Sequence, residues 1–98
     1  MTIPIHRHGD LRSCGATTVV AGQSNVFANG VLVSVDQDPN SHGGGSLSAA
    51  CKNVFVNGKM VVNHTPDSAA PDGLCIPLGG AHCGPSTAQG SSNVFVGD

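Results

Sequence analysis

The chain has 98 residues, which fits one domain over residues 1–98, and it carries a formal net charge of −2 with only 10% charged residues. Its four basic residues form no cluster, which argues against nucleic acid as a partner. Glutamate is absent, so the general base of the common zinc hydrolase motifs has no candidate. With three phenylalanines as the only aromatic residues, the core must be small, and a bound metal would add stability.

The opening segment, residues 1–10, combines a short apolar run with two histidines and a Gly-Asp turn. It has no apolar region of the kind found in secretion signals, and no later stretch approaches the roughly 18 apolar residues of a membrane span. We therefore expect the protein to be made and kept in the cytosol. His6 and His8 have strand spacing and would share one face of an edge strand. We expect both to be exposed to solvent, with a second metal-binding pair as the alternative.

One sequence unit occurs three times, as SNVFANG at residues 24–30, KNVFVNG at 52–58 and SNVFVGD at 92–98. Each copy holds one of the three phenylalanines. Alternate side chains of a strand point to opposite faces, so the valines lie on one face and the phenylalanine on the other. One of these two sets is expected to fill the core. Asn-Gly ends the first two copies and predicts a hairpin turn in each.

The segments after the copies predict the remaining strands. Residues 17–20 are β-branched and lead into the first copy, while residues 31–35 and 60–62 are expected to pair back on the first and second copies. The third copy ends the chain, so residues 2–5 are expected to supply its partner strand and close a three-part ring. Glycine and proline interrupt every window in which a helical period might begin, and the domain is therefore predicted to be all-β.

Three metal-capable residues share one position relative to the repeat. Cys14, His42 and His82 each lie 12 residues before the first valine of a copy, in loops rich in glycine or proline. If the copies are related by a pseudo-threefold axis, these side chains converge near that axis. The spacing therefore predicts a single metal site.

The four cysteines admit two interpretations. In a secreted chain they would suggest two disulfides, whereas in a reducing compartment thiols are more often metal ligands or small buried hydrophobes. Cys51 lies in the approach to the second copy and is expected to be buried.

The unit resembles the PAAR-repeat proteins, which sharpen the spike tip of contractile injection machines. It combines a Gly-Asp turn, a Cys/His-Gly pair, a valine-containing strand, an Asn-Gly turn and a return strand, and the resemblance covers the whole chain. The name motif Pro-Ala-Ala-Arg-x-Gly-Asp corresponds to residues 4–10, PIHRHGD, and its arginine is kept in one copy of three. The length is most like the spike-tip members of T-even-type bacteriophage tails, rather than toxin-bearing members of type VI secretion systems.

The resemblance implies a small cone of three β-hairpin repeats with a zinc ion near its apex, although iron can occupy such sites as well. Its flat base would sit on a trimeric β-helical spike, one copy per trimer. The protein would be made in the bacterial cytoplasm, assembled into a virion tail baseplate or equivalent machine, and meet a membrane only transiently as it helps to pierce the envelope. It would not be an enzyme. The implied ligands are Cys14, His42 and His82, with Cys75 as the expected fourth, then Cys83 and His64.

Other functions remain open from the residues alone. A small zinc metalloenzyme would need an open metal position and a base, for which only aspartates such as Asp67 or Asp72 are available. A disulfide-stapled secreted binding module would leave no free thiol. A zinc storage protein is a weaker alternative, because one ion per chain stores little.

Overall fold

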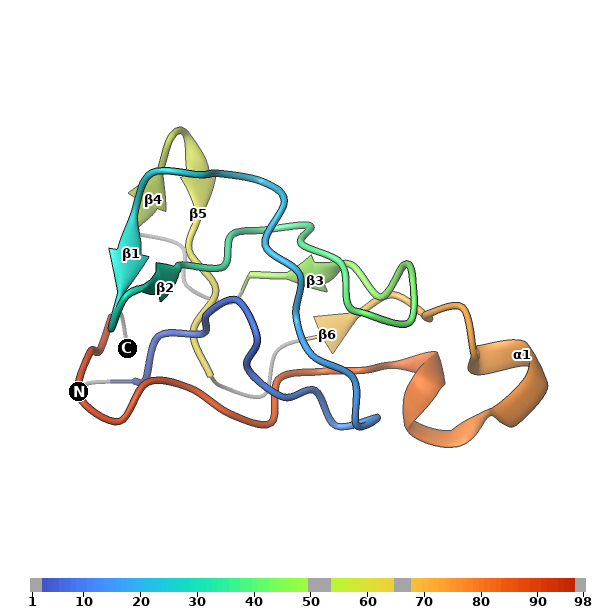
Figure 1. Cartoon of the computed structure of the whole chain (residues 1–98). Coiled ribbons are helices and arrows are strands. Elements are labelled where there is room, and N and C mark those ends of the chain that lie inside the picture. The colour runs from blue at the N-terminus through green and yellow to red at the C-terminus, as the bar shows by residue number, and fades with distance from the viewer. Residues whose placement is uncertain (1–2, 50–53, 65–67, 97–98) are drawn as a thin grey trace.

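The structure is a computed structural model that describes residues 3–49, 54–64 and 68–96, and it is a small β-rich domain with little helix (Figure 1). The paired strands within these residues are β1 (Phe27–Ala28) with β2 (Val31–Leu32), β4 (Phe55–Val56) with β5 (Lys59–Met60), and β3 (Leu47–Ser48) with β6 (Ser68–Ala69), all antiparallel. Two helical turns follow, α1 (Cys75–Leu78) and the 3₁₀ turn η1 (Gly80–Cys83). The sequence predicted no helix here.

Both predicted Asn-Gly turns are confirmed. Asn29 and Gly30 join β1 to β2 with φ of 57° and 82°, and Asn57 and Gly58 join β4 to β5 with φ of 52° and 81°. Asparagine and glycine tolerate this left-handed conformation, which matches the twist of a two-residue hairpin. The first two copies of the repeat are therefore hairpins.

The third copy takes its partner from the start of the chain, as predicted. Pro4 forms an antiparallel bridge with Phe95, and the Ile5 N–H donates to the Val94 carbonyl at 3.0 Å. The Val96 N–H donates to the Ile3 carbonyl at 2.8 Å. Thr2, the first residue of the predicted segment, lies outside the described residues.

A closed ring of main-chain hydrogen bonds joins the three partner segments. The His6 N–H donates to Val62 O at 3.0 Å, the Val62 N–H to Ser34 O at 2.9 Å, and the Ser34 N–H to His6 O at 2.9 Å. These three residues are 28 positions apart along the chain. Because each residue donates to one neighbour and accepts from the other, no segment can leave the ring without breaking two bonds.

The valine face of the second and third copies points inward, whereas Val26 of the first copy is 38% exposed. Ile5, Ala28, Val33 and Val61 are buried in one cluster, and the repeat valines 54, 56, 94 and 96 pack against it. The phenylalanines face outward: Phe27, Phe55 and Phe95 are 58%, 57% and 45% exposed. A second buried cluster consists of Leu47, Ala49 and Val62, so the apolar core as described contains aliphatic side chains and no phenylalanine.

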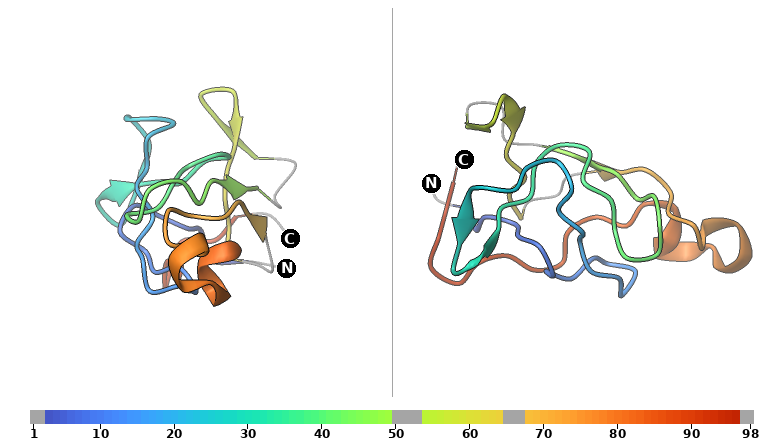
Figure 2. Two further views of the ribbon diagram at one scale, coloured as in Figure 1. Left: turned by 90° about the vertical axis from the view of Figure 1, so that its right-hand side faces the viewer. Right: turned by 45° about the horizontal axis from the view of Figure 1, so that its top comes forward.

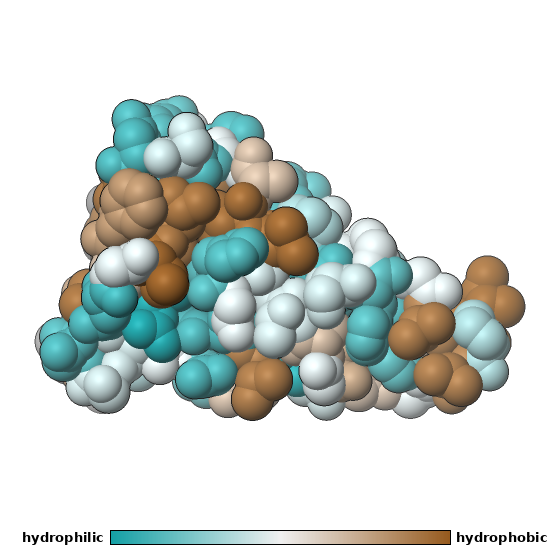
Figure 3. Space-filling model, viewed as in Figure 1, coloured by the Kyte–Doolittle hydropathy of each residue, from teal (hydrophilic) through white to brown (hydrophobic). Residues whose placement is uncertain are grey.

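The molecule is elongated, with extents of 36 × 26 × 21 Å, and it narrows from one end to the other (Figure 2). The hairpins β1–β2 and β4–β5 lie at the broad end, and α1 lies at the narrow end. Apolar surface is visible at both ends (Figure 3). Within the described residues no helix is long and apolar enough to cross a membrane.

His6 is fully buried, which corrects the expectation that it is exposed, whereas His8 is exposed. The His6 Nδ1–H donates to the Gln89 carbonyl at 2.7 Å, and the His6 Nε2 accepts from the Thr18 hydroxyl. The Thr18 oxygen accepts in turn from Arg12 Nε–H. Burial lowers the pKa of His6 to about 4, and the nearby Arg12 charge adds to this, against the opposing effects of the Gln89 bond and of Asp10. His6 is therefore a neutral core residue.

The buried His6 should make stability depend on pH. Its folded pKa of about 4 lies below the ordinary histidine value of 6.5, so its contribution to stability is complete above pH 6.5 and is lost as the pH falls toward 4. We expect the free energy of unfolding to fall by up to about 3 kcal/mol over this window from His6 alone. An NMR titration of the His6 ring in the folded protein should show a midpoint near 4. A midpoint near 6.5 would contradict the buried, hydrogen-bonded ring.

The inward valine face predicts that two truncations lower the free energy of unfolding by unequal amounts. Val61→Ala, at a side chain that is 1% exposed, should lower the free energy of unfolding by about 2 to 3 kcal/mol. Phe55→Ala, at the exposed neighbouring strand, should cost less than about 1 kcal/mol despite removing more atoms. Urea unfolding of both variants measures this. A larger loss for Phe55→Ala would mean that the phenylalanine face is the buried one.

Candidate metal centre

A cluster of four side chains at the narrow end has the composition of a metal site. Cys14, His42, Asp72 and His82 each offer one ligand atom, and these atoms all lie within 4.8 Å of one another. The structure thus brings together the three residues that share the 12-residue register. Asp72 is the fourth member, and the repeat register gives no signal for it.

The distances within the cluster match the edges of a small tetrahedron. Zinc bonds of about 2.0 to 2.3 Å to nitrogen, oxygen and sulfur place neighbouring ligand atoms about 3.3 to 3.8 Å apart. Cys14 Sγ lies 3.8 Å from His42 Nδ1 and 3.3 Å from Asp72 Oδ2. Asp72 Oδ2 lies 3.3 Å from His42 Nδ1 and 3.4 Å from His82 Nδ1. A tetrahedral ion fits this donor set with both histidines binding through Nδ1.

The Asp72 oxygen that faces the cluster is crowded with neighbours. Besides the thiol and the two imidazoles, the Asn40 side-chain amide donates to Oδ2 at 3.1 Å. A carboxylate has about two lone-pair sites per oxygen, so four such groups exceed what hydrogen bonding alone satisfies. A cation among Oδ2, the thiolate and the two rings would relieve this crowding, because one bond from Oδ2 to the ion would replace the contacts with the thiol and the two imidazoles.

Electrostatics keep Asp72 ionised. Burial acts to raise its pKa, but hydrogen bonds from the Leu74 N–H, the Asn40 amide, Cys14 and His82 outweigh burial and hold the pKa well below its usual range. At the neighbouring thiol, burial raises the pKa of Cys14 and the Asp72 carboxylate adds to the rise. Metal binding must therefore displace the thiol proton, which makes affinity depend on pH.

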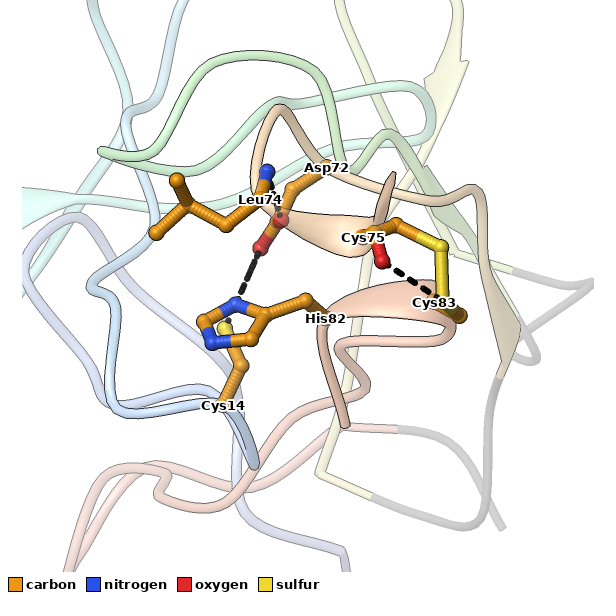
Figure 4. The surroundings of a disulfide bond; sticks show 6 residues. All are labelled: Cys14, Asp72, Leu74, Cys75, His82 and Cys83. Carbon is orange, nitrogen blue, oxygen red and sulfur yellow. Dashed lines mark hydrogen bonds and ion pairs between the residues drawn. A yellow bond between two sulfur atoms is a disulfide. The ribbon is translucent and has the colours of Figure 1, made fainter. Parts of the chain in front are cut away.

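Two neighbours hold Asp72 in place. The Leu74 N–H donates to Asp72 Oδ1 at 2.8 Å, which leaves Oδ2 directed at the cluster (Figure 4). Asn40 is buried and links two members, since its amide donates to Asp72 and its Oδ1 accepts from the His42 N–H at 2.9 Å. Such outer contacts orient metal ligands.

The glycine run after His42 allows this close packing. Gly45 has φ of 70°, and a Cβ there would lie 2.6 Å from the Asn40 side-chain nitrogen. A side chain at residue 45 would thus push on the amide that orients Asp72.

The other residues considered as the fourth ligand lie elsewhere. Cys75, the first choice, and Cys83, the second, form a disulfide with each other, so neither sulfur is available as a thiolate. His64 contacts Thr87 at 2.8 Å and is not part of the cluster. In this structure the fourth position therefore belongs to Asp72, and Cys14 is a free thiol. Cys51, expected to be buried, lies outside the described residues.

Arg12 anchors the loops that carry the cluster. Its side chain is buried, and its guanidinium donates to Gly45 O at 2.8 Å, Pro85 O at 2.7 Å and Asp38 O at 3.1 Å. The first two carbonyls lie three residues beyond His42 and His82. One side chain thus joins the loops of two cluster histidines.

Comparison with known proteins adds no assignment. No protein-family model matches the chain, and no curated protein sequence matches it significantly. The function is therefore inferred from the chain's own residues and their geometry.

The cluster predicts which side chains metal binding requires. Cys14→Ser, His82→Ala and Asp72→Asn should each reduce bound zinc by about tenfold or more after dialysis against a weak chelator, because each removes a ligand or its charge. His64→Ala is the matched control, since it removes an imidazole that lies outside the cluster. Atomic absorption on purified folded protein measures zinc per chain. Full occupancy in Asp72→Asn with loss in His64→Ala would assign the fourth position to His64.

Proposed function

We propose that the chain is a structural spike-tip protein of the PAAR-repeat type. In this proposal it is a small cone of three β-hairpin repeats, its broad end caps the trimeric β-helical spike of a contractile tail, and its narrow end is the first part to meet the target envelope. It has no enzymatic role. It is made in the bacterial cytoplasm and assembled into a tail baseplate or an equivalent injection machine.

The threefold arrangement within one chain is the observation that carries this proposal. His6, Ser34 and Val62 occupy equivalent positions in the hydrogen-bonded ring. Three chains of a symmetric trimer present three equal surfaces, and a monomer can match them only if it repeats its own contact surface three times. The exposed phenylalanines, one in each copy, supply the same apolar contact three times.

Side-chain amides reinforce the same pattern between copies. The Asn29 amide donates to Asn93 Oδ1 at 2.7 Å, and the Asn57 amide donates to Asn25 Oδ1 at 2.8 Å. Each bond joins the turn of one copy to the start of another. Rigid links between hairpins suit a surface that must fit a fixed partner without adjustment.

Zinc is the proposed metal, with a structural role. A sulfur, two imidazole nitrogens and a carboxylate oxygen form a donor set typical of zinc, although iron accepts similar ligands. Four protein ligands fill a tetrahedral ion, whereas catalytic zinc keeps one position for water. Asp72, one of the few candidates for a catalytic base, belongs to the cluster itself. This favours a structural ion over a metalloenzyme.

The disulfide favours a second candidate, an extracellular binding module stapled by cysteine pairs. The Cys75–Cys83 disulfide is consistent with an oxidising environment. Cys14, in contrast, is a free thiol among the cluster residues, which fits a metal ligand better than one half of a second disulfide. Thiol titration of the denatured, metal-free protein distinguishes the two. The spike-tip proposal expects at least one free thiol per chain, and the stapled module expects none.

The stoichiometry of binding tests the main proposal. A trimeric β-helical spike fragment from a contractile phage tail is mixed with an excess of this protein, and light scattering gives the mass of the complex. We expect one copy per trimer, because the single chain carries all three repeats. Three copies per trimer, or no binding to any such fragment, would contradict the proposal.

A matched pair of variants locates the contact surface. Replacing Phe27, Phe55 and Phe95 together with serine should weaken spike binding by about 100-fold or more, since large apolar side chains dominate such contacts. Ile76→Ser removes an apolar residue that is 98% exposed at the narrow end, and it should leave binding unchanged. If Ile76→Ser lost spike binding and the triple phenylalanine variant kept it, the contact surface would lie at the narrow end and the proposal would be wrong.

A further inference from the structure

Residues 74–84 form a lobe with little support from the rest of the molecule, whereas Asp72 and Gly73, which precede it, are joined to the loop at residues 43 and 44. In the described part of the chain, the main-chain bonds made by residues 74–84 stay within or next to the lobe, for example Gly79 N–H to Cys75 O at 2.7 Å. No residue of α1 or η1 is buried. Ile76 and Leu78 are 98% and 66% exposed. Neither packing nor a sheet fixes this lobe.

Two links close the lobe beside the metal cluster. The Asp72 N–H donates to the His82 carbonyl at 2.9 Å, which directly joins two cluster residues. The Cys75–Cys83 disulfide is the second link: Cys83 follows His82 in the chain, and the Cys75 N–H donates to Asp72 O at 3.1 Å. Figure 4 shows the disulfide adjacent to Asp72 and His82, with Cys14 facing them from another loop.

We propose that the Cys75–Cys83 disulfide holds His82 beside Asp72 in the position that metal binding needs, so that the oxidation state of the two cysteines sets the metal affinity of the cluster. This inference rests on the metal site proposed above. Without the disulfide the exposed lobe samples many conformations, and ordering it becomes part of the cost of binding the ion. With the disulfide, that ordering is complete before the ion arrives.

The chemical step is thiol–disulfide exchange. Two thiols of a small reductant such as glutathione reduce the bond: one attacks a sulfur to give a mixed disulfide and release one protein thiol, and the second releases the other. The products are two protein thiols and one oxidised glutathione. The reverse reaction in an oxidising environment restores the link.

The size of the effect follows from the closed loop. A cross-link between cysteines eight residues apart removes conformational freedom from the open segment. The entropy removed corresponds to a roughly 10- to 100-fold change in an equilibrium constant. We therefore expect the disulfide form to bind zinc about 10- to 100-fold more tightly than the reduced form. Thermodynamic linkage requires zinc to protect the disulfide from reduction by the same factor.

The first measurement is zinc affinity by chelator competition for the oxidised protein, the reduced protein and the double variant Cys75→Ser/Cys83→Ser. The reduced protein and the double variant should both show the weaker affinity, and reductant should not change the double variant. Ile76→Ser is the matched control within the lobe, because it keeps the disulfide and should bind as the unaltered chain does. Equal affinity in the oxidised protein and in the double variant would overturn the inference.

The second measurement is the equilibrium between the disulfide and graded ratios of reduced to oxidised glutathione, with and without saturating zinc. Zinc should shift the midpoint toward more reducing mixtures. A shift in the opposite direction would mean that the released thiols bind the ion, as the sequence suggested for Cys75, and would overturn the inference. If the oxidised protein binds no zinc, the proposed metal site is wrong. If it binds zinc with an affinity that does not depend on the disulfide, only the present inference is wrong.

Discussion

The closed ring of hydrogen bonds among His6, Ser34 and Val62 is the constraint on which the rest of the structure depends. Strands of two residues have too few bonds to be stable alone, and a single hairpin is marginal in water. The ring turns three marginal segments into one cooperative unit, because each segment is held by both others. It also brings Ile5, Val33 and Val61, which precede the ring residues in the chain, into one buried cluster. A core of small side chains is sufficient there.

A buried arginine extends this order to loops that have no regular structure. Arg12 donates to the carbonyls of Gly45, Pro85 and Asp38, and the Asp38 carbonyl also accepts from the Leu47 N–H. A guanidinium with five donors in one plane suits this task. Burying its charge is costly, and the hydrogen bonds offset that cost only if all the loops are in place. Arg12 therefore couples the loops that carry His42 and His82 to the repeat core.

Repetition is the part of this structure that the sequence predicts well. Equivalent positions in the three copies become equivalent positions in space, so the hairpins, the pairing of the chain start with the last copy and the meeting of Cys14, His42 and His82 are all visible in the spacing. Features outside the repeat are not. Asp72 joins the cluster from an irregular loop with no counterpart in the other copies, and the Cys75–Cys83 pairing depends on two helical turns too short to give a periodic signal. His6 is buried because its ring meets Thr18 and Gln89, which no alternation pattern reveals.

The two ends of the molecule are thus stabilised by different physical effects. At the broad end, valines and a hydrogen-bonded ring form a core that involves none of the metal-capable cluster residues. At the narrow end, no residue of α1 or η1 is buried, and order comes from a disulfide and from a carboxylate held by Asn40 and Leu74. An ion bound by the cluster would add to that order. Apolar side chains are buried only where enough chain surrounds them, and the narrow end has too few residues to surround a core. Covalent and coordinate bonds have no such requirement, which is a physical reason for the cysteines, the histidines and the ionised Asp72 to gather where the molecule is thinnest.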